Sequence, residues 1–348
     1  MASSPLHTLP LAGRRGSLVA LAAFTLALTP SLPAETIDRI EKTLPAKPGG
    51  TLVVDLAGAK IDVRSAAGDA VAIDIERKIR ASTKDAEERY LEEHAITIEK
   101  AGNVITIRQT KPGKQGWFTG FWSGLKTKSS AECSVIVPRE FNVDLDTSGG
   151  PISVRDLTGN VRADTSGGSI RCENITGRVA ADTSGGSITF VRVHGEANAD
   201  TSGGNITAES GSGRLTLDTS GGNIRVSGHR GDVAADTSGG SITLEGIQGN
   251  VMGDTSGGSI HATLLAAPTA ECRLSTSGGG ITVTMPAGAA VELNAASSGG
   301  RVMSEFDVAG TEVLKKKRNE VHGPINGGGP LLHLRTSGGS IQLERSKG

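Results

Sequence analysis

Short runs of alternating apolar and polar residues recur at a fixed distance along most of the chain. Each unit carries an isoleucine five positions after a repeated threonine and a second apolar residue two positions further on. Alternation with a period of two is typical of strands that bury one face. The isoleucines are Ile152, Ile170, Ile188, Ile206, Ile224, Ile242 and Ile260.

The repeated threonine opens a Thr-Ser-Gly-Gly motif that returns every eighteen residues and then at longer spacings. A second apolar pair, such as Val161 and Ala163, stands four and two residues before the next threonine. A fixed period near twenty residues indicates units that bury their apolar faces only by stacking. We therefore predict an all-β fold, a β-solenoid of stacked 18-residue coils with two short strands per coil and Thr-Ser-Gly-Gly turns. The motifs begin at Thr147, Thr165, Thr183, Thr201, Thr219, Thr237, Thr255, Thr276, Ser297 and Thr336.

The glycines of this motif suggest a backbone requirement at the turn. Glycine adopts positive φ without steric cost, so we expect the paired glycines to supply that conformation. Neighbouring Asp, Ser and Thr side chains form local hydrogen bonds in such turns. The last motif, at Thr336, is expected to form the coil that closes the stack.

The region before the regular repeats shows a weaker version of the same pattern. Alternation from Thr51 and again at Ile61-Asp62-Val63 predicts a degenerate coil. Residues 83–94 predict one short helical insertion, which Ser82 or Thr83 caps. We expect a hairpin around Gly102 and divide the chain into residues 1–34, a β-rich region 35–140 and a regular solenoid 141–348.

Residues 1–34 have the pattern of an export signal peptide. Arg14 and Arg15 precede an apolar run from Leu18 to Leu28, and a small residue, Ala34, stands at the expected cleavage point. The apolar run is too short to span a membrane. We expect an exported protein that begins at Glu35, with periplasm, cell surface and medium all open as destinations.

Composition narrows the classes of function. Glycine, at 49 residues, is about twice its usual share of roughly 7%. A net charge of −1 argues against a nucleic-acid partner. Three cysteines make a disulfide framework improbable, and Cys172 and Cys272 fall at apolar positions where buried thiols are expected.

An aromatic and basic segment, residues 111–128, interrupts the strand pattern. Such a segment has two interpretations. It contacts a membrane surface, a glycan or an envelope protein, or it folds back over an apolar face of the solenoid. Its candidate interaction residues are Trp117, Phe118, Phe121 and Trp122.

An aspartate precedes each regular motif, so the coils should place these carboxylates in a row about 5 Å apart. Calcium is one hypothesis, because it takes clustered oxygen ligands. The alternative is that each aspartate accepts hydrogen bonds from its own turn, and the nine-residue units of calcium-binding β-rolls are absent. The row is Asp146, Asp164, Asp182, Asp200, Asp218, Asp236 and Asp254.

No motif predicts catalysis. Asp-Thr-Ser-Gly-Gly is similar to short protease patterns, but a nucleophile is singular and needs a positioned base, whereas this motif recurs. We expect no catalytic residues, no cofactor and no enzymatic activity. The competing hypothesis is a carbohydrate-active enzyme, a polysaccharide lyase or hydrolase, built on the same solenoid.

The repeated Thr-Ser-Gly-Gly-Ser/Asn-Ile, the approach from Val135 to Leu145 and the closing stretch from Gly323 to Ile341 resemble the bacterial DUF4097 family. The resemblance extends from about Thr51 to Leu343. It implies an exported β-solenoid labelled as an adhesin because of its architecture, and it brings no catalytic residues. The leading hypothesis is a non-enzymatic envelope or surface protein that contacts a glycan, a protein or a membrane surface.

Overall fold

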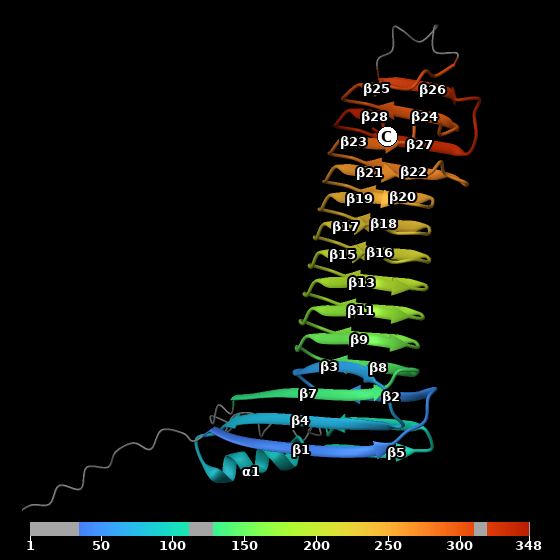
Figure 1. Cartoon of the computed structure of the whole chain (residues 1–348). Coiled ribbons are helices and arrows are strands. Elements are labelled where there is room, and N and C mark those ends of the chain that lie inside the picture. Colours follow the sequence, from blue (N-terminus) through green and yellow to red (C-terminus); the bar gives the residue numbers. More distant parts are fainter. Residues whose placement is uncertain (1–34, 111–127, 310–318, 348) are drawn as a thin grey trace, which may run out of the picture.

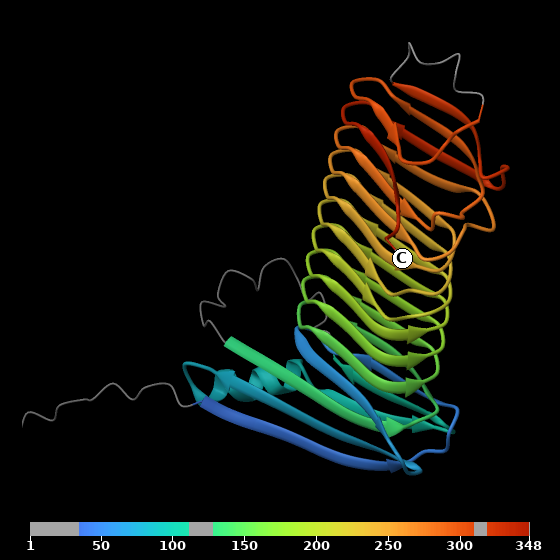
Figure 2. The same ribbon diagram turned by 45° about the horizontal axis from the view of Figure 1, so that its top comes forward.

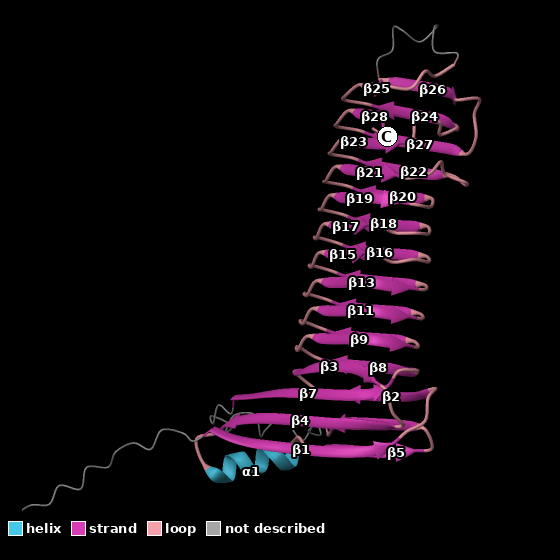
Figure 3. Ribbon diagram, viewed as in Figure 1, coloured by secondary structure: helices cyan, strands magenta, loops and turns pink. Residues whose placement is uncertain are grey.

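Two facing β-sheets form an elongated stack in the computed structural model, which describes residues 35–110, 128–309 and 319–347 (Figure 1). These residues contain 28 strands, 14 in each sheet, and one helix. The prediction of an all-β solenoid with a single helical insertion is confirmed. Figure 3 shows how completely the strands account for the stack.

The first sheet, sheet A, runs along one side of the stack. In spatial order its strands are β1 (Glu35–Pro45), β4 (Ala70–Arg80), β7 (Lys128–Pro138), β3 (Ala59–Ala66), β9 (Ile152–Thr158), β11 (Ile170–Thr176), β13 (Ile188–His194), β15 (Ile206–Glu209), β17 (Ile224–Ser227), β19 (Ile242–Ile247), β21 (Ile260–Leu264), β23 (Ile281–Met285), β28 (Ile341–Arg345) and β25 (Val302–Ser304).

The second sheet, sheet B, faces it. From the opposite end, its strands are β26 (Glu320–Ile325), β24 (Val291–Ser297), β27 (Leu331–Thr336), β22 (Cys272–Thr276), β20 (Val251–Thr255), β18 (Val233–Thr237), β16 (Leu215–Thr219), β14 (Ala197–Thr201), β12 (Val179–Thr183), β10 (Val161–Thr165), β8 (Phe141–Thr147), β2 (Gly50–Asp55), β6 (Val104–Gln109) and β5 (Ile96–Ala101).

The regular coils contribute one strand to each sheet, as the 18-residue period predicts (Figure 2). Strands of successive coils pair in parallel and in register, so Ile170 lies opposite Ile188 and Val161 opposite Val179. The inward-facing residues of both sheets are buried and form one continuous core. Because the register is exact to the residue, each position of the repeat becomes a straight row along the stack.

The threonine of each motif joins neighbouring coils. The Thr201 hydroxyl donates to the carbonyl oxygen of Gly186 at 2.9 Å and accepts from the backbone N–H of Gly204 at 3.2 Å. The threonine side chain is buried, and its hydroxyl supplies hydrogen bonds to two backbone groups in the turns, where strand pairing does not. The same pair of bonds recurs from Thr165 to Thr336.

The paired glycines have a different role from the predicted one. Neither glycine of the regular motifs has a positive φ; that conformation belongs to the opposite turn, at Gly159, Gly177 and Gly195, with φ of 140° to 150°. The second motif glycine is required by proximity instead. A Cβ on Gly186 would lie 1.9 Å from the carbonyl oxygen of Gly168 in the preceding coil.

The N-terminal strands extend the stack rather than form a separate core. The predicted degenerate coil is present, since Leu52 pairs with Val143 and Ile61 with Ile152. Beyond it, β1, β4 and β7 are long antiparallel neighbours that protrude past the regular coils (Figure 2). The predicted hairpin is β5 and β6.

The helix α1 (Lys84–Glu93) connects β4 of sheet A to β5 of sheet B. Thr83 is its N-cap, and its hydroxyl accepts from the backbone N–H of Ala86 at 3.2 Å. Glu87 accepts a hydrogen bond from Thr36 at the start of β1, so the helix lies against the protruding strand ends (Figure 1).

The last residues of the chain do not close the stack as expected. β27 pairs with β22 on one side and β24 on the other, and β28 lies between β23 and β25. The final coil is therefore inserted below the coil that precedes it in sequence. A constant repeat spacing predicts the spatial order of the coils only where short turns join one coil directly to the next. After Thr276 the connections are longer, so the last coil in sequence can take the place below its predecessor.

The two motif glycines provide a matched pair of variants. Gly186→Ala forces a methyl group into the backbone of the preceding coil and should destabilise the protein by about 1–3 kcal/mol or more, as overpacking does. In Gly185→Ala the nearest atom is 3.8 Å from the new Cβ, so we expect a much smaller change. Denaturant unfolding of both variants checks this, and equal losses would contradict it.

Candidate functional site

The seven predicted aspartates form a straight row on the outer face of sheet B, which we call the aspartate ladder. In-register pairing places Asp164 beside Asp182, Asp182 beside Asp200 and so on along the sheet. Two shallow polar grooves of about 480 and 350 Å³ follow the ladder and are otherwise lined mainly by serines and threonines of the turns.

Among the described residues, no ladder aspartate from Asp164 onward makes the turn hydrogen bond that one interpretation assigned to it. Asp164 accepts from the guanidinium of Arg162 at 2.9 Å. Within the described part of the chain, no hydrogen bond or ion pair reaches the other ladder carboxylates from Asp182 onward. The turns are held by the threonine hydroxyls instead, because those hydroxyls lie inside the stack.

Partial burial and crowding together raise the pKa of three ladder carboxyls. Partial burial is the first cause for Asp182, Asp218 and Asp236, and the charges of neighbouring ladder aspartates add to it. Across the three described ranges, no group of three or more Asp, Glu, His or Cys side chains is arranged to hold a metal ion. Calcium binding by the ladder stays a hypothesis.

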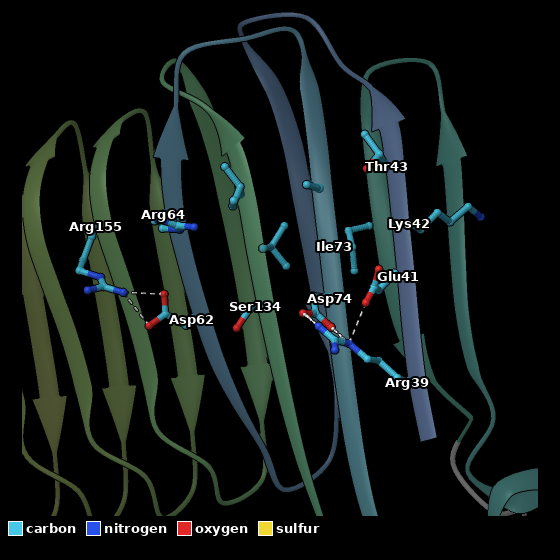
Figure 4. Close-up of a pocket in the computed structure, with 13 residues that line it drawn as sticks. Arg39, Glu41, Lys42, Thr43, Asp62, Arg64, Ile73, Asp74, Ser134 and Arg155 are labelled. Atoms are coloured by element: carbon cyan, nitrogen blue, oxygen red, sulfur yellow. Dashed lines mark hydrogen bonds and ion pairs between the residues drawn. The ribbon is translucent and has the colours of Figure 1, made fainter. Parts of the chain in front are cut away.

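A second feature lies on the outer face of sheet A, where the regular coils meet the antiparallel strands (Figure 4). It is a hollow of about 470 Å³ that crosses β1, β4, β7, β3 and β9. We call it the arginine hollow. Its charged walls are formed by Arg39, Glu41, Lys42, Asp62, Arg64, Asp74 and Arg155, and the small or apolar side chains of its floor include Ala72, Ser134 and Ile136.

Strand pairing explains how these residues meet. Asp74 lies opposite Ser134 in the β4–β7 pair, and Ser134 lies opposite Asp62 in the β7–β3 pair. One row across the sheet therefore places a serine between two aspartates. The next row brings Arg64 beside Arg155 through the β3–β9 pair.

Both aspartates of the hollow are held by arginines. Arg39 donates to the two carboxylate oxygens of Asp74 at 3.0 and 2.7 Å, and the Nη2 of Arg155 lies 2.9 Å from both oxygens of Asp62. The hydrogen bond from Arg39 lowers the pKa of Asp74. That carboxyl is therefore a stable anion and a poor proton donor.

Arg64 differs from its neighbours. Its side chain is exposed and lines the hollow beside the Arg155–Asp62 pair (Figure 4). It has no hydrogen-bond or ion-pair partner among the described residues. The hollow thus contains three ion pairs, Arg39 with Glu41 and Asp74 and Arg155 with Asp62, and one exposed guanidinium, that of Arg64, without such a pair.

The remaining predicted residues have varied outcomes. Trp117, Phe118, Phe121 and Trp122 lie outside the described residues, as does the predicted signal 1–34. The buried thiols expected at Cys172 and Cys272 are confirmed. Burial raises the pKa of the Cys172 thiol to about 12, so it is unreactive at neutral pH.

The arginine hollow was not predicted from the sequence. One signal was present, because aligning Ile61 with Ile152 places Arg64 in the same row as Arg155. The other wall depends on antiparallel pairing of β1, β4 and β7, which the repeat does not encode.

Comparison with known proteins assigns the architecture. The sequence profile of the Toastrack DUF4097 family matches residues 50–344. The chain belongs to the Toastrack DUF4097 family. The resemblance expected from the repeats is thereby confirmed, and the family region includes both the aspartate ladder and most of the arginine hollow. Among curated proteins, none matches the chain.

Several solved structures are similar to this Toastrack chain. One from Bacteroides fragilis, provisionally described as an adhesin, has 11% identity, covers 89% of this chain and 98% of its own, and has a TM-score of 0.35. One from Parabacteroides distasonis, provisionally described as a lipid binding protein, has 13% identity, coverage of 89% and 97%, and a TM-score of 0.33. At these values they support no assignment of a ligand.

The described helix α1 is too short and too polar to cross a membrane, and no other helix is described.

The raised pKa values of three ladder aspartates, caused by partial burial and mutual repulsion, lead to a pH-dependent prediction. Because the pKa values of Asp182, Asp218 and Asp236 are raised by folding, the folded state binds more protons, and these groups lower the free energy of unfolding as pH rises. The triple Asn variant should therefore have a higher unfolding midpoint than the wild type at pH 7. The difference should shrink in acid and in high salt.

Thermal unfolding at several pH values and ionic strengths measures this difference. A less stable triple variant at pH 7 would contradict the repulsion. The same measurement with added calcium tests the ladder as an ion site. Calcium should then raise the wild-type unfolding midpoint more than sodium chloride of equal ionic strength does, and it should give no such rise in the triple variant.

Proposed function

We propose that this protein is a non-enzymatic, exported β-solenoid that acts at the cell envelope or surface as an adhesin-like contact protein. One observation carries the proposal. Seven successive coils present the same outward positions in register, on a backbone whose turns are held by buried, hydrogen-bonded threonines. A rigid row of identical groups is suited to a partner that itself repeats, such as a polymer.

The state of the carboxylates supports binding over catalysis. General acid catalysis needs a carboxyl with a raised pKa beside the scissile bond. In the arginine hollow the pKa of Asp74 is instead lowered by Arg39. Three ladder aspartates, Asp182, Asp218 and Asp236, have raised pKa values, but they lie in open grooves with no arginine, lysine or histidine except Arg162.

Export rests on the pattern of residues 1–34 and carries its own prediction. The protein expressed in a bacterial host should be processed before Glu35. Mass measurement of the intact purified protein and sequencing of its first residues check this. An unprocessed protein that begins at Met1 and stays in the cytoplasmic fraction would contradict the proposal.

Cosedimentation with purified insoluble bacterial envelope tests the function. The chain from Glu35 should pellet with the envelope in a saturable manner, and no reducing ends should be released. Gly185→Ala should retain binding, whereas Gly186→Ala should lose it as the stack is disrupted. Release of reducing ends would favour the enzyme, and failure of the wild type to pellet would contradict a role in contact.

A further inference from the structure

The arginine hollow combines three kinds of surface. Its walls hold ionised carboxylates, its edge holds the unpaired guanidinium of Arg64, and its floor is small and partly apolar at Ala72, Ser134 and Ile136. Its volume of about 470 Å³ is within the range of roughly 300–1,000 Å³ common for small-molecule sites.

We propose that the arginine hollow binds a saccharide unit that bears a carboxylate. The proposal rests on the proposed envelope contact and names the class of ligand recognised there. It places the ligand's carboxylate on Arg64, its hydroxyls on Asp62, Asp74 and Ser134, and one face of its ring over Ala72 and Ile136.

Arg64 is the group that selects the acid. A guanidinium presents paired N–H donors in a fork that matches a carboxylate. Arg39 and Arg155 already use such donors on Asp74 and Asp62. Arg64 has no partner of its own in the described structure, so it can bind a ligand without breaking an existing ion pair.

The aspartates select hydroxyl groups. An ionised carboxylate only accepts hydrogen bonds and has about four lone-pair positions, so Asp62 and Asp74 retain acceptor capacity after pairing with arginine. The lowered pKa keeps Asp74 in this accepting form. Ser134 lies between them in the same row and supplies a hydroxyl that donates or accepts.

The charge balance opposes two other occupants. Four cationic side chains, the three arginines and Lys42, face Glu41, Asp62 and Asp74, and Lys42 donates to the carbonyl oxygen of Ile98. The excess is one positive charge, which is too little for a polyphosphate or an anionic membrane surface. A cationic ligand would meet carboxylates that arginines already neutralise. A ligand with one negative charge and many hydroxyls matches the groups that stay available, the guanidinium of Arg64 and the acceptor positions of the aspartates.

Calorimetric titration of the chain from Glu35 with trigalacturonate tests the proposal, with maltotriose as the neutral saccharide. We expect binding of trigalacturonate and at least tenfold weaker binding of maltotriose. Arg64→Gln should weaken trigalacturonate binding about tenfold to hundredfold, the range expected for a hydrogen-bonded charge. Arg230→Gln, which replaces an exposed arginine outside the hollow, should change it less than about twofold.

Four results would overturn the proposal: no binding of trigalacturonate, equal binding of maltotriose, an unchanged affinity in Arg64→Gln, or displacement by inorganic phosphate at the same concentration. Unchanged unfolding midpoints show that both variants fold. Envelope cosedimentation of the wild type distinguishes a failure of the saccharide site from a failure of the proposed envelope contact. If the wild type pellets but trigalacturonate fails, the contact function stands and the saccharide site is wrong.

Discussion

Close approach of each coil to the next is the constraint on which the rest of this structure depends. The second glycine of every motif lies almost against a carbonyl oxygen of the coil before it, which leaves no room for a side chain. The threonine hydroxyl of the same motif donates a hydrogen bond to that same carbonyl oxygen. Together they fix the register, and the register turns each position of an 18-residue repeat into a row along the sheet.

This geometry has an electrostatic consequence. Any charged residue retained at one position of the repeat must lie beside its own copies, at about the 4.8 Å spacing of paired strands. The ladder aspartates meet this condition on the outer face of sheet B, where partial burial and the neighbouring charges raise the pKa values of Asp182, Asp218 and Asp236. At the N-terminal end the repeat lapses, so unlike residues become neighbours. That change allows arginines and aspartates to pair and a hollow to form.

The sequence predicted most of the array and little of the site. Isoleucine and valine spacing was sufficient for the two sheets, because parallel in-register stacking needs only a constant period. The roles within the turn were assigned wrongly, since proximity between coils is not visible along one coil. The position of β27 and β28 and the pairing of β1, β4 and β7 depend on long connections, which carry no periodic signal. Arg64 and Asp74 meet only through that pairing.

A crystal structure of the chain from Glu35 with bound trigalacturonate would test the account most directly. The account predicts a carboxylate of the ligand on the guanidinium of Arg64, ligand hydroxyls within hydrogen-bond distance of Asp62 or Asp74, and an unchanged stack beneath them. A ligand lying along the aspartate ladder, or in the arginine hollow with its carboxylate directed away from Arg64, would contradict it.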